Sequence, residues 1–229
     1  MKKITISNLI DFGRKRNQNS QLTLLNNIKK PKKEKTDNEG GGNYWMTSLS
    51  TISAVYKTEN KELIEEKILD ITNRFKRAST KRSKDMYVKN IEILKNFEEF
   101  EMKDLKPSTK ITMLTKPEEK SVIQICGLPV QIRPHHIYSF EEKGKPMVGG
   151  IWFVAKKGGY SKDELQMFTD AIFRYMSTHH SERFTVHPKF CVAVDAFSTN
   201  HSRYSDIANN ETHSLIDPTL ETIKKMLGL

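Results

Sequence analysis

Hydrophobic positions along the chain follow two different periods, one in each half. Residues 60–76 carry Ile64, Ile71 and Phe75 in a set of apolar positions three or four residues apart, with charged residues between them. This spacing places the apolar side chains on one face and predicts an amphipathic helix. After Pro107, short apolar segments separated by turn residues take over, which is typical of β-strands. The chain therefore divides into a helical part followed by a part rich in strands.

The order of elements between residues 128 and 197 is the most informative pattern. A helix is predicted from Ser161 to about His180, and Ser161 with Glu164 matches a capping box at its start. Four apolar, strand-like segments surround this helix, three before it and one after it. These segments are 128–132, 136–140, 150–155 and 190–194.

These elements predict an α/β (α+β) protein. Further strands at 110–115 and 122–126 would give a meander of about five strands joined by tight turns. We expect basic N-terminal helices followed by a mixed, largely antiparallel sheet with flanking helices. Three regions are predicted, with a basic arm and linker over 1–43, a helical region over 44–106 and an α/β sheet domain over 107–229.

The excess of positive charge lies entirely in the first 89 residues. That segment holds 20 Lys and Arg residues against 10 Asp and Glu, whereas residues 90–229 hold 18 of each, and the net charge is +10. Such asymmetry indicates a basic appendage that can meet a polyanion, so DNA or RNA is the expected partner. No apolar run approaches the roughly 18 residues of a membrane span, and no signal peptide is recognisable. We therefore expect a cytoplasmic protein with no membrane partner.

Two basic clusters are the candidate contacts to nucleic acid. The first comprises Lys29, Lys30, Lys32 and Lys33. The second comprises Arg74, Lys76, Arg77, Lys81, Arg82 and Lys84. Residues 77–83 are predicted to form a polar break between two helices, with Ser83 as the cap of the second helix. A basic turn of this kind can contact phosphates, and it is also a common solvated loop, so both interpretations stay open.

Two short motifs in the strand-like segments bear on catalysis. An Arg-Pro-His-His sequence ends in His135 and His136 at the second apolar segment, and Lys156 ends the third. With the order strand-strand-strand-helix-strand, these motifs make residues 85–197 resemble the PD-(D/E)XK nuclease superfamily. The resemblance implies a core in which an Asp and a second acid bind Mg²⁺ while a Lys orients the attacking water.

This sequence departs from that family at the metal ligands. His135 stands where the Asp is expected and Val154 where the second acid is expected, although Lys156 is present. Gln166 matches a Gln that opens a helical motif in one subgroup of the superfamily, but Asp170 replaces the Tyr expected after it. The resemblance therefore implies a degenerate nuclease-like core.

Histidine and Asp195 offer the remaining candidate chemistry. All seven histidines lie at or after position 135, and their spacing fits no zinc motif, so no metal site is expected. Neighbouring residues of a strand point to opposite faces, so His135 and His136 are not expected to share a ligand. Asp195 ends a strand, where it could form a general base pair with a histidine or cap the following turn at 198–200.

Three classes of function stay open. We favour a non-catalytic subunit that binds nucleic acid or a protein partner on a degenerate nuclease-like core, without a cofactor. The first alternative is a divergent metal-dependent nuclease that uses Mg²⁺ or Mn²⁺. Its candidate catalytic residues are Lys156, Asp195, His135, His136 and Gln166. The second alternative is a protein-interaction scaffold.

A second resemblance suggests a biological setting. Uncharacterised bacterial proteins share an Arg-Pro pair, a strand that ends in Lys and a Cys-X-Val-X-Asp strand, found here at 133–134, 149–156 and 191–195. The likeness is compatible with a role in a bacterial defence or mobile-element system. It implies no particular activity.

Overall fold

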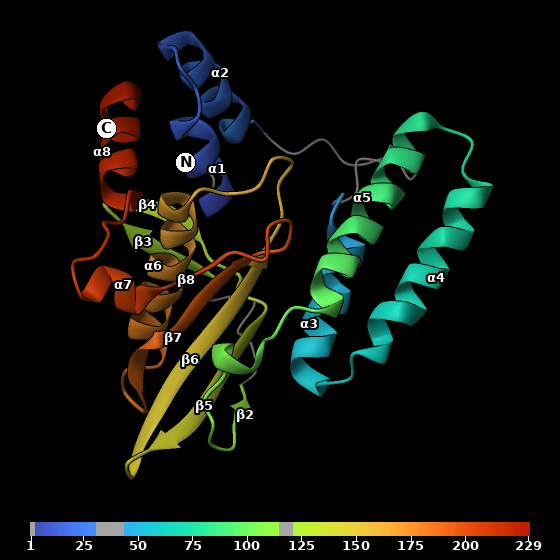
Figure 1. Cartoon of the computed structure of the whole chain (residues 1–229). Coiled ribbons are helices and arrows are strands. Elements are labelled where there is room, and N and C mark those ends of the chain that lie inside the picture. The colour runs from blue at the N-terminus through green and yellow to red at the C-terminus, as the bar shows by residue number, and fades with distance from the viewer. Residues whose placement is uncertain (1–2, 31–43, 115–120) are drawn as a thin grey trace.

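A five-stranded mixed sheet with helices on both faces forms the centre of the molecule (Figure 1). The computed structural model describes residues 3–30, 44–114 and 121–229. The strands, in spatial order, are β2 (Thr112–Met113), β5 (His136–Glu142), β6 (Lys145–Val154), β7 (Thr185–Asp195) and β8 (His201–Arg203). Strands β6 and β7 are parallel and are joined by α6 (Lys162–His179), while the other neighbours are antiparallel. The predicted α/β class, with a mixed sheet and flanking helices, is confirmed.

A smaller sheet of three strands lies next to the first. Its spatial order is β1 (Ile4–Thr5), β4 (Leu128–Gln131) and β3 (Val122–Ile125), with β1 parallel to β4. The expected single meander is therefore wrong, because β3 and β4 form a separate hairpin while β2 pairs with β5. The parallel partner of β4 comes from the start of the chain, and a pairing between such distant segments leaves no trace in the local pattern of apolar residues.

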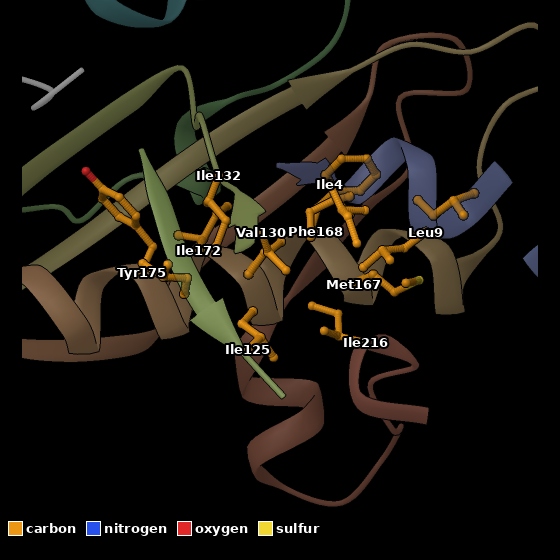
Figure 2. Packing of buried hydrophobic residues seen from close by; sticks show 14 of the residues in the cluster. Ile4, Leu9, Ile125, Val130, Ile132, Met167, Phe168, Ile172, Tyr175 and Ile216 are labelled. Carbon is orange, nitrogen blue, oxygen red and sulfur yellow. The ribbon is translucent and has the colours of Figure 1, made fainter. Parts of the chain in front are cut away.

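The first hydrophobic core lies between the smaller sheet and α6. The helices on this side are α1 (Ile6–Gly13), α2 (Gln18–Lys29), α6, the short α7 (Tyr204–Ala208) and α8 (Ile216–Leu227). Figure 2 shows Ile4 and Leu9 near Phe168 and Met167 of α6, with Val130 of β4 beside them. Residues 3–30, expected as part of a basic arm, thus supply β1, α1 and α2 to this unit.

The second hydrophobic core lies on the opposite face of the larger sheet, under a three-helix unit. Its helices are α3 (Met46–Thr58), α4 (Glu62–Arg77) and α5 (Lys81–Glu98), followed by the short η1 (Lys103–Leu105). Ile52 and Phe97 pack there with Phe153 of β6, and each is at most 1% exposed. Side chains alternate along β6, so Phe153 faces these helices while Val154 faces α6. No helix in the described part of the chain is long and apolar enough to cross a membrane.

Helix α5 begins earlier than the sequence predicts. Thr80, and not Ser83, caps the helix, because the Thr80 hydroxyl oxygen accepts a hydrogen bond from the Ser83 N–H at 3.2 Å. Thr80 has the extended backbone of a cap residue, and Ser83 already lies in the first turn. The break between α4 and α5 therefore shrinks to residues 78–80. Lys81 and Arg82, expected in a loop, stand on the helix.

Helix α3 receives its N-terminal cap from α5. Its own cap position is Trp45, whose side chain makes no capping hydrogen bond. The Asn90 side chain instead accepts from the Ser48 N–H at 3.0 Å and donates to the Tyr44 carbonyl oxygen at 2.8 Å. Because the first N–H groups of a helix have no partner within it, this buried amide satisfies one of them and fixes α5 against α3.

Two adjacent glycines allow close packing on both faces of β6. A methyl group added at Gly149 would lie 2.8 Å from the Phe190 carbonyl oxygen on β7. One added at Gly150 would lie 2.5 Å from Cε of Met176 and 3.0 Å from the His136 carbonyl oxygen. A larger residue at Gly149 would therefore push on the β7 backbone, and one at Gly150 would displace the end of Met176 and press on the His136 carbonyl.

An ion-pair network joins α6 to α8. Arg174 donates to Asp217 through two nitrogens, at 2.8 and 2.6 Å, and to Asp170 at 2.9 Å. The hydrogen bonds from Arg174 lower the pKa of Asp217, against the opposing effect of burial. A carboxylate with a lowered pKa contributes stability above its unfolded-state pKa, and this contribution is lost as the pH falls through the folded-state pKa.

We predict that Gly150→Ala lowers the free energy of unfolding by about 1–3 kcal/mol, because Met176 can yield but the His136 carbonyl cannot. Urea unfolding measures the change. Gly13→Ala is the matched control, since a methyl group there meets nothing within 4 Å, and it should be neutral or slightly stabilising. A Gly150→Ala protein as stable as the wild type would contradict the close packing.

We predict that Asp217→Asn lowers the free energy of unfolding by about 1 kcal/mol near neutral pH, because water screens this half-exposed pair. The difference from the wild-type protein should shrink below about pH 4 and vanish once Asp217 is protonated in both states. Urea unfolding over a series of pH values measures it, with Glu182→Gln, exposed in the turn after α6, as the control. A penalty that does not change with pH would argue against the ion pair.

Candidate functional site

Lys156 joins the end of β6 to α1. Its ammonium forms an ion pair with Asp11, and Arg14, the residue after α1, forms a neighbouring ion pair with Glu164 at the start of α6. Burial alone would raise the pKa of Glu164, but hydrogen bonds from Arg14 and from the Ser161 N–H outweigh burial and lower it. The lysine expected to orient a water molecule is therefore paired with Asp11, and this pair and the neighbouring Arg14–Glu164 pair fasten the α1 region to the end of β6 and the start of α6.

Asp195 caps the turn that follows β7. Its carboxylate is fully buried and accepts hydrogen bonds from the Tyr160 N–H at 3.1 Å, the Phe197 N–H at 3.0 Å and the Ser198 hydroxyl at 2.9 Å. A methyl group on Gly159, which has a φ of +73°, would lie 2.8 Å from the same carboxylate. Asp195 thus holds the β6–α6 and β7–β8 connections together. This agrees with the interpretation of Asp195 as the cap of the following turn.

The two adjacent histidines contact β6 and the three-helix unit rather than Asp195. The His135 Nδ1 accepts from the Phe153 N–H at 3.2 Å, and its ring lies edge-on to that phenylalanine. The His136 Nε2 lies 2.8 Å from the Ser53 hydroxyl, and its ring stacks on Tyr56. The expectation of opposite faces is wrong, because β5 begins only at His136 and both rings contact the second core.

The strand order separates the two histidines from Asp195. Strand β6 lies between β5 and β7, so the backbones of His135 and Asp195 are two strand spacings apart, on the order of 10 Å. Groups that exchange a proton must lie within hydrogen-bond reach of each other or of one shared water. The strand order therefore keeps the histidines apart from Asp195.

Gln166 has a structural environment inside α6. It is fully buried, and its amide nitrogen donates to Asp206 of α7 at 3.2 Å while its oxygen accepts from Thr169 at 2.9 Å. Asp170, where the family motif expects Tyr, is buried and paired with Arg174. Among residues 3–30, 44–114 and 121–229, no group of three or more His, Cys, Asp and Glu residues could hold a metal ion.

The second basic cluster gathers at the tip of the α4–α5 hairpin. We call residues 74–84 the basic tip. All six of its Lys and Arg residues are exposed, and it contains no Asp or Glu. Figure 1 shows the α4–α5 connection at the end of the hairpin that points away from the larger sheet. The structure thus turns a cluster along the sequence into one projecting surface, whose residues 74–84 have a formal charge of +6 and in which Arg74 is paired with Asp70.

Three of the six cations of the basic tip lie at a helix end where the helix dipole disfavours positive charge. Arg74, Lys76 and Arg77 lie in the last turn of α4, where cations favour the negative end of the helix dipole. Lys81 and Arg82, by contrast, begin α5 at its positive end, Lys84 follows one turn later, and no acid offsets them in that first turn. Each such cation costs a few tenths of a kcal/mol, so helix stability does not explain their position.

The first basic cluster is only partly described. Lys29 ends α2 and Lys30 follows it, and both are exposed. Lys32 and Lys33 lie outside the described residues. A binding role for this cluster stays a prediction.

A hollow that the sequence did not indicate lies between α3, η1 and the larger sheet, with a volume of about 870 Å³. Lys106, whose side chain is 12% exposed, lies there 4.6 Å from the centre of the Tyr56 ring and 2.7 Å from Glu59. The residues that line this hollow include five basic and five acidic ones. The hollow therefore has no net positive charge that would attract an anion. These residues come from distant segments, and no motif could have revealed them.

We predict that Asp195→Asn destabilises the fold by about 2–4 kcal/mol, because the amide nitrogen would face donors and leave buried N–H groups without an acceptor. Thermal and urea unfolding measure the loss. Asp163→Asn, exposed at the start of α6, is the control, with an expected loss below about 1 kcal/mol. A stable Asp195→Asn protein, or Mg²⁺ stabilisation of the wild type that the variant lacks, would instead favour a catalytic carboxylate.

Comparison with known proteins adds no family to this geometry. No protein-family model, no curated protein and no solved structure matches the chain.

Proposed function

We propose that this protein is a nucleic-acid-binding subunit and that the basic tip is its binding surface. One observation carries the proposal, namely that Lys81, Arg82 and Lys84 crowd the start of α5, which the helix dipole disfavours. A bound phosphate would reverse this penalty, because it would be attracted by both the cations and the helix N-terminus. Exposed cations at the wrong end of a helix are therefore accounted for by an anionic ligand.

The rest of the fold supports binding rather than cleavage. Lys156 and Asp195 each have structural partners within the α/β body, His135 contacts β6, and His136 contacts the three-helix unit. The degenerate nuclease-like core suggested by the sequence would serve as the support of the hairpin in this proposal. Asn90 connects α5 to α3, and α3 packs on the larger sheet, so the tip is anchored to the body at its base.

We predict that Lys81→Gln/Arg82→Gln/Lys84→Gln lowers the affinity for DNA or RNA about 10- to 100-fold at moderate salt, because three phosphate contacts are removed. The same variant should match the wild type in stability or exceed it by about 1 kcal/mol, because cations leave the positive end of α5. Fluorescence anisotropy with labelled oligonucleotides measures the affinity, and thermal unfolding measures the stability.

The matched control removes the same charge elsewhere. Lys110→Gln/Lys143→Gln/Lys145→Gln changes three exposed lysines near β2 and the β5–β6 turn, and it should alter affinity less than about threefold. An equal loss in both variants would show attraction by net charge alone and would count against the tip. A wild-type protein that binds no DNA or RNA even at low salt would overturn the proposed function.

A further inference from the structure

The basic tip has no surface on which unpaired bases could stack. Its one aromatic residue, Phe75, is half-buried, with the Lys84 ammonium 5.9 Å from its ring centre. Across the described parts of the chain no Phe, Trp or Tyr is exposed, and the exposed large apolar side chains are Met46, Leu69, Val88, Leu215 and Leu229. Proteins that hold single strands stack bases on exposed aromatic side chains, so this surface is poorly suited to a single strand.

The side chains of the tip also suit phosphates better than base edges. Between Arg74 and Lys84 there is no Asn, Gln, Asp or Glu that could read adenine or cytosine, and the Arg and Lys side chains there can contact phosphates as well as guanine. The Thr80 and Ser83 hydroxyls bond to each other at 2.8 Å as part of the α5 cap. What the tip offers a ligand is therefore mainly cationic groups.

The cations form two groups, one on each helix. Arg74, Lys76 and Arg77 end α4, while Lys81, Arg82 and Lys84 begin α5, and the helices run antiparallel. Axes of packed helices lie about 8–10 Å apart, and long side chains widen the spread to on the order of 20 Å. That spread can reach phosphates on both sides of a groove about 6–12 Å wide, whereas a single strand offers one row of phosphates.

We infer that the ligand of the basic tip is a nucleic-acid duplex, bound through the phosphates of both strands and without regard to base sequence. The inference rests on the proposed function and narrows it to one class of substrate. An anionic lipid surface fits less well, because Phe75 and Ala78 are the only apolar residues of the tip and an interfacial segment needs an apolar face.

The test compares five probes under one buffer and a series of salt concentrations. They are an AT-rich DNA duplex, a GC-rich DNA duplex, an RNA duplex, a DNA single strand of equal length and phosphatidylserine vesicles. We expect a duplex to bind at least about fivefold more tightly than the single strand, since the latter lacks a stacking surface here. The two DNA duplexes should differ less than about threefold, and the logarithm of the binding constant should fall with that of the salt concentration with a slope of about −5 for six contacts.

The outcomes separate the inference from the proposed function. Stronger binding to the single strand, with loss in the Lys81→Gln/Arg82→Gln/Lys84→Gln variant, would overturn the duplex inference and leave the proposed function in place. A preference of more than about tenfold between the DNA duplexes would likewise overturn it, because base contacts would then contribute. Binding to vesicles alone would overturn both. The duplex that binds more tightly, DNA or RNA, is identified as the ligand.

Discussion

The fold depends on the pairing of β6, which has a strand on each side and a hydrophobic core on each face. Parallel pairing with β7 requires a crossover, and α6 provides it by covering one face. The other face is then available to the three-helix unit. The two cores thus lie on opposite faces of the same strand, where Gly149 and Gly150 leave no room for a larger residue.

Local elements could be predicted from the sequence, and long-range pairings could not. The capping box at Ser161 and Glu164 is present as expected, since it depends on residues three positions apart. The pairing of Ile4 with Val130 depends on where two distant segments meet, so the smaller sheet could not be foreseen. Thr80 was missed as the α5 cap because Ser83, an equally good capping residue, stands nearby.

The candidate site shows the same division. The charge of the basic tip is a property of the sequence, whereas the position of Lys81 and Arg82 on α5 was not predicted. The environments of Lys156 and Asp195 were not predictable, because Asp11 and Tyr160 reach them through folding alone. A lysine and a carboxylate at the ends of parallel strands suggest catalysis in many folds, and here both have partners that stabilise the body.

The short connection between α4 and α5 fixes the backbone of the basic tip before a ligand binds. Six cations stand on two packed helices joined by residues 78–80, so their backbone is already ordered before any ligand arrives. A disordered basic tail loses conformational entropy when it binds, whereas a prefolded hairpin loses little beyond side-chain freedom. Under the proposed function, such a surface would suit rapid, reversible encounters, in which one stretch of polyanion is released and the next is taken up.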